Sequence, residues 1–461
     1  MRHGIGRLFG IFVAASGVFF LGIGEAKAFT LLDGNFELKG YVRNVTAVRT
    51  EDPKGGLGGD QFKKGEVEFC GTTLNLDGEY RLSPELKVYG RWRGSYDASF
   101  DFKGQDKFPQ EVVDDQRLKN EVRELFVDYK KGPLFLRVGK QLVIWGEADA
   151  LRLADLVNPL DASFHFGQLS PEDARIALPM VRAIYGLTLD TDLEIIWAPV
   201  TFVPQKFSGK GTYWEIPGTG IGGLPEKDYP TNINNGSVGG KIKTKLAGID
   251  LSFFDYYRRL DAPTLELTSV GPMFVHPFVN STGATFNASS NQLGAIFRGE
   301  AVYNRNEPQM DMTKPNFISK KNSVAALIGI DRPTLLPISP DSTMLSFQAY
   351  HKRVLDVDPT TITFGNSSHP GEKPYQTLFT FLFAPLYNFL IPNSTVSPQL
   401  FVEYDVEKSG IIQPSVGFKY GNNLNIILGY TKFYGTKGGR GVVDAVVDRS
   451  EAYIDVKYSF M

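Results

Sequence analysis

The sequence contains a single cysteine, Cys70, so no disulfide can form within the chain. Histidine is also scarce, and the four beyond the N-terminal segment, His165, His276, His351 and His369, are not spaced to share a metal ion. The 49 basic and 51 acidic residues give a net charge of -2, without the basic excess of nucleic-acid-binding proteins. No serine and histidine are spaced as a hydrolase pair. We therefore expect no catalytic residues, no metal, no cofactor and no nucleic acid partner.

Long apolar runs are confined to the N-terminus. Arg2 and Arg7 precede an uncharged stretch over residues 8–24, and Ala26-Lys27-Ala28 matches the small-x-small cleavage rule. This pattern predicts a secretory signal peptide at residues 1–28 and a mature chain of residues 29–461, where no linker or low-complexity tract divides a single domain. A second weakly charged run, residues 376–392, is interrupted by Pro385 and predicts a strand ending in a loop.

Pairs of segments with alternating apolar and polar residues recur along the mature chain, each pair joined by a very short turn. The turns fall at residues 83–85, 130–133, 190–192 and 421–423, whereas the long polar stretches include residues 204–235 and 260–291. Short turns at one end and long loops at the other are typical of transmembrane β-barrels, with the turns facing the periplasm. The last ten residues before Met461 also alternate and end on Phe460, as the closing strand of such a barrel does.

The predicted fold is therefore all-β, a transmembrane antiparallel β-barrel in the bacterial outer membrane with outer-membrane lipid around it. In hydrocarbon every backbone group must be paired within the protein, so strands can span only in a sheet without edges. The tally of strands comes out odd, which a single-chain barrel does not allow, and the ambiguous region is residues 303–400. Allowing for loop lengths we expect about 16 strands, with 14 and 18 left open.

Charged residues occupy the positions that face the lumen if the apolar positions face lipid. Across the turn at residues 83–85, Asp77 falls opposite Arg91, and Glu79 is diagonal to Lys87 and Arg91. Two interpretations remain open: a neutralised polar lining, or a charge ladder that orients a solute near a constriction. The predicted lumen charges are Asp77, Glu79, Lys87, Arg91, Arg93, Glu124, Asp128 and Arg137.

The period of the sequence changes within residues 137–161. It reads as a strand up to Val143, and after Trp145-Gly146 an apolar stripe at helical spacing runs to Val157, before Asn158-Pro159 ends it. A barrel of this width leaves an aqueous hole unless something fills it, so we expect an inward-folded helical loop that narrows the lumen. The alternative is an extracellular lid. The predicted constriction or loop residues are Trp145, Glu147, Asp149, Arg152, Asp155, Asn158, Pro159 and Asp161.

Five fragments together resemble a bacterial outer-membrane β-barrel family that is catalogued as a domain of unknown function. They are GKQLVIWGEADALRLADLVNPLD at residues 139–161, LPMV at 178–181, FRGEAVY at 297–303, LIGIDRP at 327–333 and SFQAYHK at 346–352. The family signature is G-[KR]-Q-x-V-x-W-G-E followed by N-P-x-D. The resemblance implies a porin-like barrel of unsettled substrate, some of whose relatives work with periplasmic lipid-carrier-like proteins and inner-membrane exporters. It marks as motif positions Gly139, Gln141, Trp145, Gly146, Glu147, Asn158, Pro159 and Asp161.

The function expected from these patterns is a passive channel or transporter for an unknown small solute or a lipophilic compound. The family resemblance implies a periplasmic carrier or an inner-membrane exporter as its partner. One alternative is a barrel that sheathes an extracellular electron-transfer conduit, which an unplugged lumen lined by small polar residues would favour. The other alternative is a surface protein without transport activity, such as an adhesin.

Overall fold

The computed structural model describes residues 29–31, 34–53, 61–163, 171–199, 202–216, 218–365, 367–388 and 391–460. The predicted signal peptide, residues 1–28, lies outside the described residues. Within the described ranges, no helix has the length and apolar character needed to cross a membrane.

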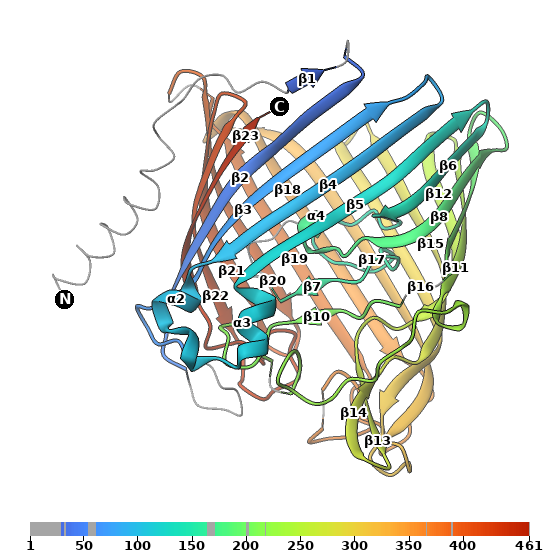
Figure 1. Ribbon diagram of the computed structural model, residues 1–461, viewed down its shortest axis with the longest axis vertical. Coiled ribbons are helices and arrows are strands. Elements are labelled where there is room, and N and C mark those ends of the chain that lie inside the picture. The colour runs from blue at the N-terminus through green and yellow to red at the C-terminus, as the bar shows by residue number, and fades with distance from the viewer. Residues whose placement is uncertain are drawn as a thin grey trace.

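The described residues form one antiparallel sheet of 19 strands that closes on itself (Figure 1). The short β1 (Phe29–Leu31) pairs with β2, and β2 also pairs with β3 and with β23, so that 18 strands form a closed wall. In order around the barrel these strands are β2 (Phe36–Arg49), β3 (Val67–Arg81), β4 (Leu86–Asp97), β5 (Leu118–Lys131), β6 (Leu134–Gln141), β8 (Leu178–Gly186), β9 (Thr191–Ala198), β11 (Ser237–Leu246), β12 (Ile249–Arg259), β15 (Phe278–Ser290), β16 (Ala295–Met310), β17 (Ile318–Leu336), β18 (Ser339–Val354), β19 (Tyr375–Leu386), β20 (Ser394–Asp405), β21 (Ser409–Tyr420), β22 (Leu424–Tyr434) and β23 (Glu451–Phe460).

The expected all-β closed barrel is confirmed; the main estimate of about 16 strands is corrected to 18, one of the two counts left open. One reason is β15, which lies within residues 260–291, a stretch that its polar composition assigned to a loop. A second reason is that two connections at the long-loop end, residues 311–317 and 406–408, are short. Hairpins can be counted from sequence only where short and long connections alternate, and at these two places they do not.

The two ends of the barrel differ as the sequence predicted. One end carries short turns, together with β1 and the C-terminus, at the top of Figure 1. The other end carries the long connections, which hold α2 (Ser99–Lys103), η1 (Gln105–Lys107), α3 (Gln110–Gln116), η3 (Ile233–Asn235) and the hairpin of β13 (Thr264–Thr268) and β14 (Gly271–Val275). Two connections also hold elements that lie inside the wall, α4 (Pro171–Ala174), β7 (Asp161–Ala162) and β10 (Lys206–Phe207), of which β7 and β10 pair in parallel.

The wall has an apolar outer face and a mixed inner face, because successive side chains of a strand point to opposite sides. On β17, Val324 and Ile328 are exposed on the outer face, whereas Ala325 and Leu327 alternate with them and are buried inside. On β5 the exposed Val127 stands next to the buried Asp128. In a closed sheet the backbone N–H and C=O groups are hydrogen-bonded to neighbouring strands, so the apolar outer face needs no water.

Candidate functional site

The connection from β6 to β8 enters the barrel and packs against its inner wall. Residues 142–162 of this connection are called the inner segment below. The helix predicted from Trp145 to Val157 is wrong: the backbone from residue 142 to residue 160 is irregular, and β6 ends at Gln141 rather than Val143. The reason is that side chains of distant strands take the backbone N–H groups that a helix would use.

Glu300 of β16 holds two separate parts of the inner segment. Its Oε1 accepts hydrogen bonds from the backbone N–H of Glu147 at 2.5 Å and of Ala148 at 2.8 Å, and its Oε2 accepts one from Ala154 at 2.6 Å. Gly146 lies against the same carboxylate, since a Cβ there would stand 3.0 Å from Oε1. Hydrogen bonds to an ionised acceptor are stronger than neutral ones, so this one side chain fixes the path of the segment.

Neighbouring strands add further polar attachments. Arg298 of β16 donates from Nη1 to the Glu147 carbonyl at 2.8 Å and to Asp149 Oδ2 at 2.6 Å, and also forms an ion pair with Asp331 of β17. Gln348 of β18 accepts from the Leu151 N–H at 3.3 Å. The inner segment is therefore tied directly to β16 and β18 by lumen-facing side chains, and to β17 through Arg298.

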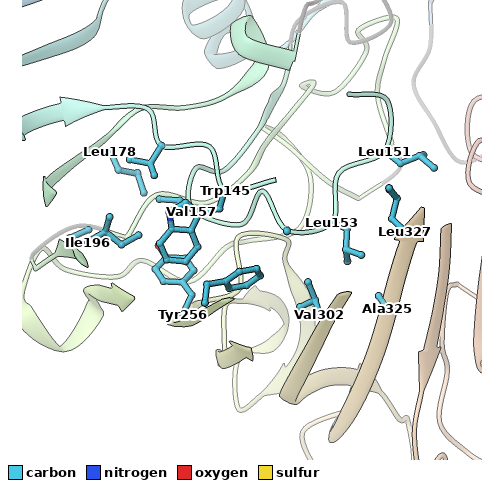
Figure 2. Close-up of a cluster of buried hydrophobic side chains, with 14 of the residues drawn as sticks. Trp145, Leu151, Leu153, Val157, Leu178, Ile196, Tyr256, Val302, Ala325 and Leu327 are labelled. Carbon is cyan, nitrogen blue, oxygen red and sulfur yellow. The ribbon is translucent and has the colours of Figure 1, made fainter. Parts of the chain in front are cut away.

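The apolar side chains of the inner segment fall into two groups on the inner wall (Figure 2). In the first group, Trp145 is 1% exposed and its ring lies 5.4 Å from that of Phe254 and 5.6 Å from that of Tyr256. Its indole N–H donates to Glu194 Oε1 at 3.1 Å. Gly239 of β11 makes room for the indole, because a Cβ there would stand 2.9 Å from Trp145 Cη2.

In the second group, Leu151 and Leu153 lie beside Val302, Ala325 and Leu327 of β16 and β17 (Figure 2). The cluster that joins both groups extends to Leu378 of β19. Full burial of an aliphatic or aromatic side chain is worth about 1.5–3 kcal/mol, so this packing stabilises the inner segment as much as its hydrogen bonds do.

The segment turns back on itself at Asn158. The Asn158 side chain accepts from the Val143 N–H at 2.7 Å and donates to the Ile176 carbonyl at 2.8 Å, which brings the two arms of the connection together. Asp155 accepts from Arg152 at 3.1 Å and from Arg175 at 2.7 Å. Arg152 and Asp155 are three positions apart and form an ion pair, although no helix brings them together.

The second arm of the connection reaches the opposite wall. Asp173 of α4 accepts from Arg43 of β2 at 3.4 Å, and its carbonyl accepts from Arg123 of β5 at 2.8 Å. A β-bulge in β5 opposite Arg91 and Trp92 turns both Arg123 and the next residue inward. The connection thus contacts the wall from β8 to β19 and again from β2 to β5.

Asp161 anchors the inner segment to β5 through Lys119, whose Nζ lies 3.5 Å from Oδ2. Burial by itself would raise the pKa of Asp161, but the Lys119 charge and hydrogen bonds from Ser163 outweigh it and hold the pKa below the ordinary aspartate value. Asp161 is therefore ionised at neutral pH and pairs as a full negative charge.

The predicted lumen charges meet across β3 to β6. Asp77 accepts from Arg91 at 2.6 Å and Asp128 accepts from Arg137 at 2.6 Å, as the register implied. The remaining contacts continue the row from strand to strand: Glu79 with Lys87 at 3.2 Å, Lys87 with Asp128 at 3.7 Å, Arg91 with Glu124 at 3.4 Å and Arg93 with Glu121 at 2.6 Å. Glu121 and its second partner Arg123, at 3.6 Å, were missing from the expected set.

The predicted loop residues are thus in one region but in different settings. Trp145, Asp155, Asn158 and Asp161 are buried, Asp149 is mostly exposed with 78% of its side chain accessible, and Pro159 lines a small pocket beside Val157. The residues that hold them, chiefly Glu300, Arg298, Gln348 and Glu194, were not predicted. Three of these lie within the fragments FRGEAVY and SFQAYHK, and the five fragments of the resemblance converge on this one site.

A second connection, between β9 and β11, also crosses the mouth of the barrel, and the sequence did not indicate it. Tyr213 and Trp214 pack in an apolar cluster with Phe433 of β22, where the rings of Trp214 and Phe433 lie 5.4 Å apart. Arg49 of β2 donates to the Tyr213 carbonyl at 3.3 Å. Over the part of the chain that the structure describes, no group of three or more His, Cys, Asp or Glu residues is arranged to hold a metal ion.

Comparison with solved structures places the fold among porin-like barrels. The chain is similar to OccAB2 of Acinetobacter baumannii, with 11% identity over 94% of this chain and 99% of that one and a TM-score of 0.52. OccAB1 of the same organism gives 10% identity, 94% and 98% coverage and a TM-score of 0.52. OccK2 of Pseudomonas aeruginosa, solved in complex with glucuronate, gives 9% identity, 94% and 99% coverage and a TM-score of 0.50. Identities this low show a shared fold.

The family follows from the sequence comparison. None of the curated proteins searched matches the chain. A family model described as "Protein of unknown function (DUF1302)" matches residues 10–460. The chain therefore belongs to the DUF1302 family, and its fold is that of an outer-membrane porin.

Proposed function

We propose that this protein is a passive outer-membrane channel whose lumen is narrowed by the inner segment. The observation that carries the proposal is the attachment of residues 147–154 to Glu300, which holds part of the chain inside a barrel wide enough to conduct. An inward loop fixed by charge-assisted hydrogen bonds sets the size of the remaining path. The apolar outer face and the likeness in fold to OccAB2 support a location in the bacterial outer membrane.

The charged row on β3 to β6 supports a role in guiding a polar or charged group through the narrowed lumen. Arg91 lies between Asp77 and Glu124, so that carboxylates and guanidinium groups alternate along the path. Such rows orient a passing solute without binding it tightly, because each charge is already partly neutralised by a neighbour. The direction of movement then comes from a gradient or from a partner, for which a periplasmic carrier or an inner-membrane exporter remains the proposal.

A sheath for an electron-transfer conduit is disfavoured by the same geometry. Such a sheath must accept another protein in its lumen, whereas here the connections β6–β8 and β9–β11 occupy the interior with packed side chains. The proposal does not involve catalysis.

Conductance measurement tests the proposal. Purified protein in planar bilayers should give discrete current steps, and a variant in which residues 147–155 are replaced by a short glycine linker should give larger steps. Trp197→Ala, which alters an exposed side chain on the outer face of β9, is the matched control and should leave the step size unchanged. The absence of any current or solute uptake in liposomes from the folded wild-type protein would overturn the channel function.

A further inference from the structure

The backbone pairing between β19 and β20 is interrupted near the short-turn end of the barrel. The ladder runs from Leu378 paired with Asp405 to Phe383 paired with Leu400, and then stops. It resumes only as a single bridge between Tyr387 and Val396, in the same register. Residues 384–386 and 397–399 face one another across this interval without ladder pairing.

Two prolines cause the interruption. The register places Pro385 directly opposite Pro398. Tyr387 and Val396 exchange both N–H···O bonds at 2.9 Å, and such bonded pairs recur at every second position, so Pro385 and Pro398 occupy the next bonded pair. Neither has an N–H, and both bonds of that pair are lost. From Phe383 to Tyr387 the seam therefore runs for about 13 Å without a backbone bond, at about 3.3 Å per residue.

Single prolines at two other places in the wall do not have this effect. The ladder of β17 with β18 continues through Pro333 paired with Met344, and that of β16 with β17 continues through Pro308 paired with Lys320. A further lapse occurs where β21 meets β22, at Gln413 and Pro414. The hairpin of β20 and β21, whose own ladder is continuous, is thus bounded on both sides by weakened seams.

On the lumen side of the interrupted seam, β19 presents apolar side chains, whereas β20 presents Ser397 and Gln399. Leu382 pairs with Phe401 facing inward, and Ala384 and Leu386 continue the same face of β19 toward the turn. Leu378 lies four positions before Leu382, further from the short-turn end, and belongs to the apolar cluster of the inner segment. Thr380 and Glu403 form a polar pair on this face, and Gln399 lies opposite Ala384. The lumen face of β19, apolar except for Thr380, thus leads from the inner segment to the seam, on a different part of the wall from the charged row.

The outer side of the seam is apolar. Phe383 and Leu400 stand at one end of the interruption, and Tyr387 and Val396 stand at the other. In this state the seam is closed, because the ring of Pro385 is buried. An ordinary bonded pair at this position would hold the strands together with two backbone hydrogen bonds, and these are absent here. Separating the strands therefore breaks only side-chain packing.

We propose that the seam between β19 and β20 is a lateral opening through which an amphipathic solute with a hydrocarbon tail passes between the lumen and the membrane leaflet on the short-turn side. This inference rests on the proposed channel function and specifies its substrate class. The tail follows the lumen face of β19, while a polar head group keeps to the charged side of the lumen. The paired prolines reduce the resistance of the seam to opening.

A reversible cross-link across the seam tests the proposal. Phe383→Cys/Leu400→Cys places two cysteines at a bonded pair, where a Cα separation of about 5.5 Å permits a disulfide. The prolines stay in place, and the buried Cys70 is left unchanged. Leu428→Cys/Ile454→Cys, across the continuous ladder of β22 with β23, is the matched control. The readouts in the same proteoliposomes are transfer of a fluorescent long-chain fatty acid into the bilayer and ion current.

The oxidised seam variant should lose fatty-acid transfer and regain it on reduction, with ion current unchanged, while the control cross-link alters neither. A second variant, Pro385→Ala/Pro398→Ala, restores both donors, and two added hydrogen bonds should slow transfer by up to roughly 30-fold. Equal fatty-acid transfer by the oxidised and reduced seam variant, or an equal loss of transfer in the control, would overturn the lateral opening. Ion current measured in the same samples would then still support the channel function. Fatty-acid transfer that returns on reduction, without any ion current, would support the lateral opening and refute the ion-conducting channel. The absence of both transfer and current would refute both proposals.

Discussion

Replacement of Glu300 by alanine is expected to release the inner segment from the wall while leaving the barrel intact. The variant removes the acceptor of three backbone N–H groups, those of Glu147, Ala148 and Ala154. A hydrogen bond to a charged group contributes about 1.5–3 kcal/mol, but the freed amides regain water from the lumen. We therefore assign about 1 kcal/mol to each, or about 3 kcal/mol in total. The equilibrium between docked and undocked segment should shift by roughly 100-fold.

Labelling of Ala148→Cys by a water-soluble thiol reagent measures that shift, since this position is partly buried when the segment is docked. Labelling should be much faster in the Glu300→Ala background, and single-channel current should become larger or noisier. Glu85→Ala removes an exposed carboxylate from a short turn and serves as the control. Identical labelling rates with and without Glu300, in protein that still runs as a folded barrel, would refute the assignment of this carboxylate as the anchor.

Three further expectations concern the packing, the charged row and the pH dependence of the site. Gly239→Ala should destabilise the docked segment together with the wall beneath it by about 1–3 kcal/mol through overpacking, because its Cβ would stand 2.7 Å from Tyr256 Cδ2 and 2.9 Å from Trp145 Cη2; tryptophan fluorescence during urea titration measures this. Gly240→Ala should have no such effect, because its Cβ would meet nothing closer than 3.7 Å. Asp77→Asn should leave Arg91 with less neutralised charge and raise the anion-to-cation permeability ratio, and an unchanged reversal potential in a salt gradient would contradict this. Because the pKa of Asp161 is lowered in the folded state, its ion pair contributes stability above the ordinary aspartate pKa of about 3.9 and loses it as pH falls through the lowered pKa. Asp161→Asn should therefore lower Tm at pH 7 and have little effect once the wild-type carboxylate is protonated, and an equal effect at both extremes would count against the pairing.

The wall was predictable from sequence where its strands obey a simple alternation. Residues 125–129 alternate between an outer apolar face and an inner face that carries Asp128, and the register across the turns followed from turn length alone. The pairing of Asp77 with Arg91 was correct for the same reason. The strand β15 was not predicted from the sequence, because its small polar residues lack the apolar alternation. Only its hydrogen bonding to β12 and β16 identifies it as a strand.

The interior could be predicted only in part. Residues 145–161 contact the inner wall through the lumen-facing Glu300. The external lid left open beside the inward loop does not match these contacts, and the role of these residues in narrowing the lumen stays a prediction. Their helical pattern was misleading, because that apolar periodicity serves packing against two separate patches of wall, whereas the amide donors are used by Glu300 and Gln348. Contacts between residues more than a hundred positions apart leave no local trace in the sequence. The roles of the charged row and of the motif positions remain predictions.

The distance along the chain between the inner segment and its anchor has a consequence for assembly. Glu147 and its acceptor on Glu300 are 153 positions apart, and Leu151 and Gln348 are 197 apart. In the unfolded chain the segment is therefore far from the strands that will receive it, and the entropy cost of closing so large a loop is met only once those strands are in place. Docking of the segment is therefore completed late: a chain that stops before β16 retains the contacts of Trp145 with β9 and β12 but lacks the acceptor that fixes the backbone from Glu147 to Ala154.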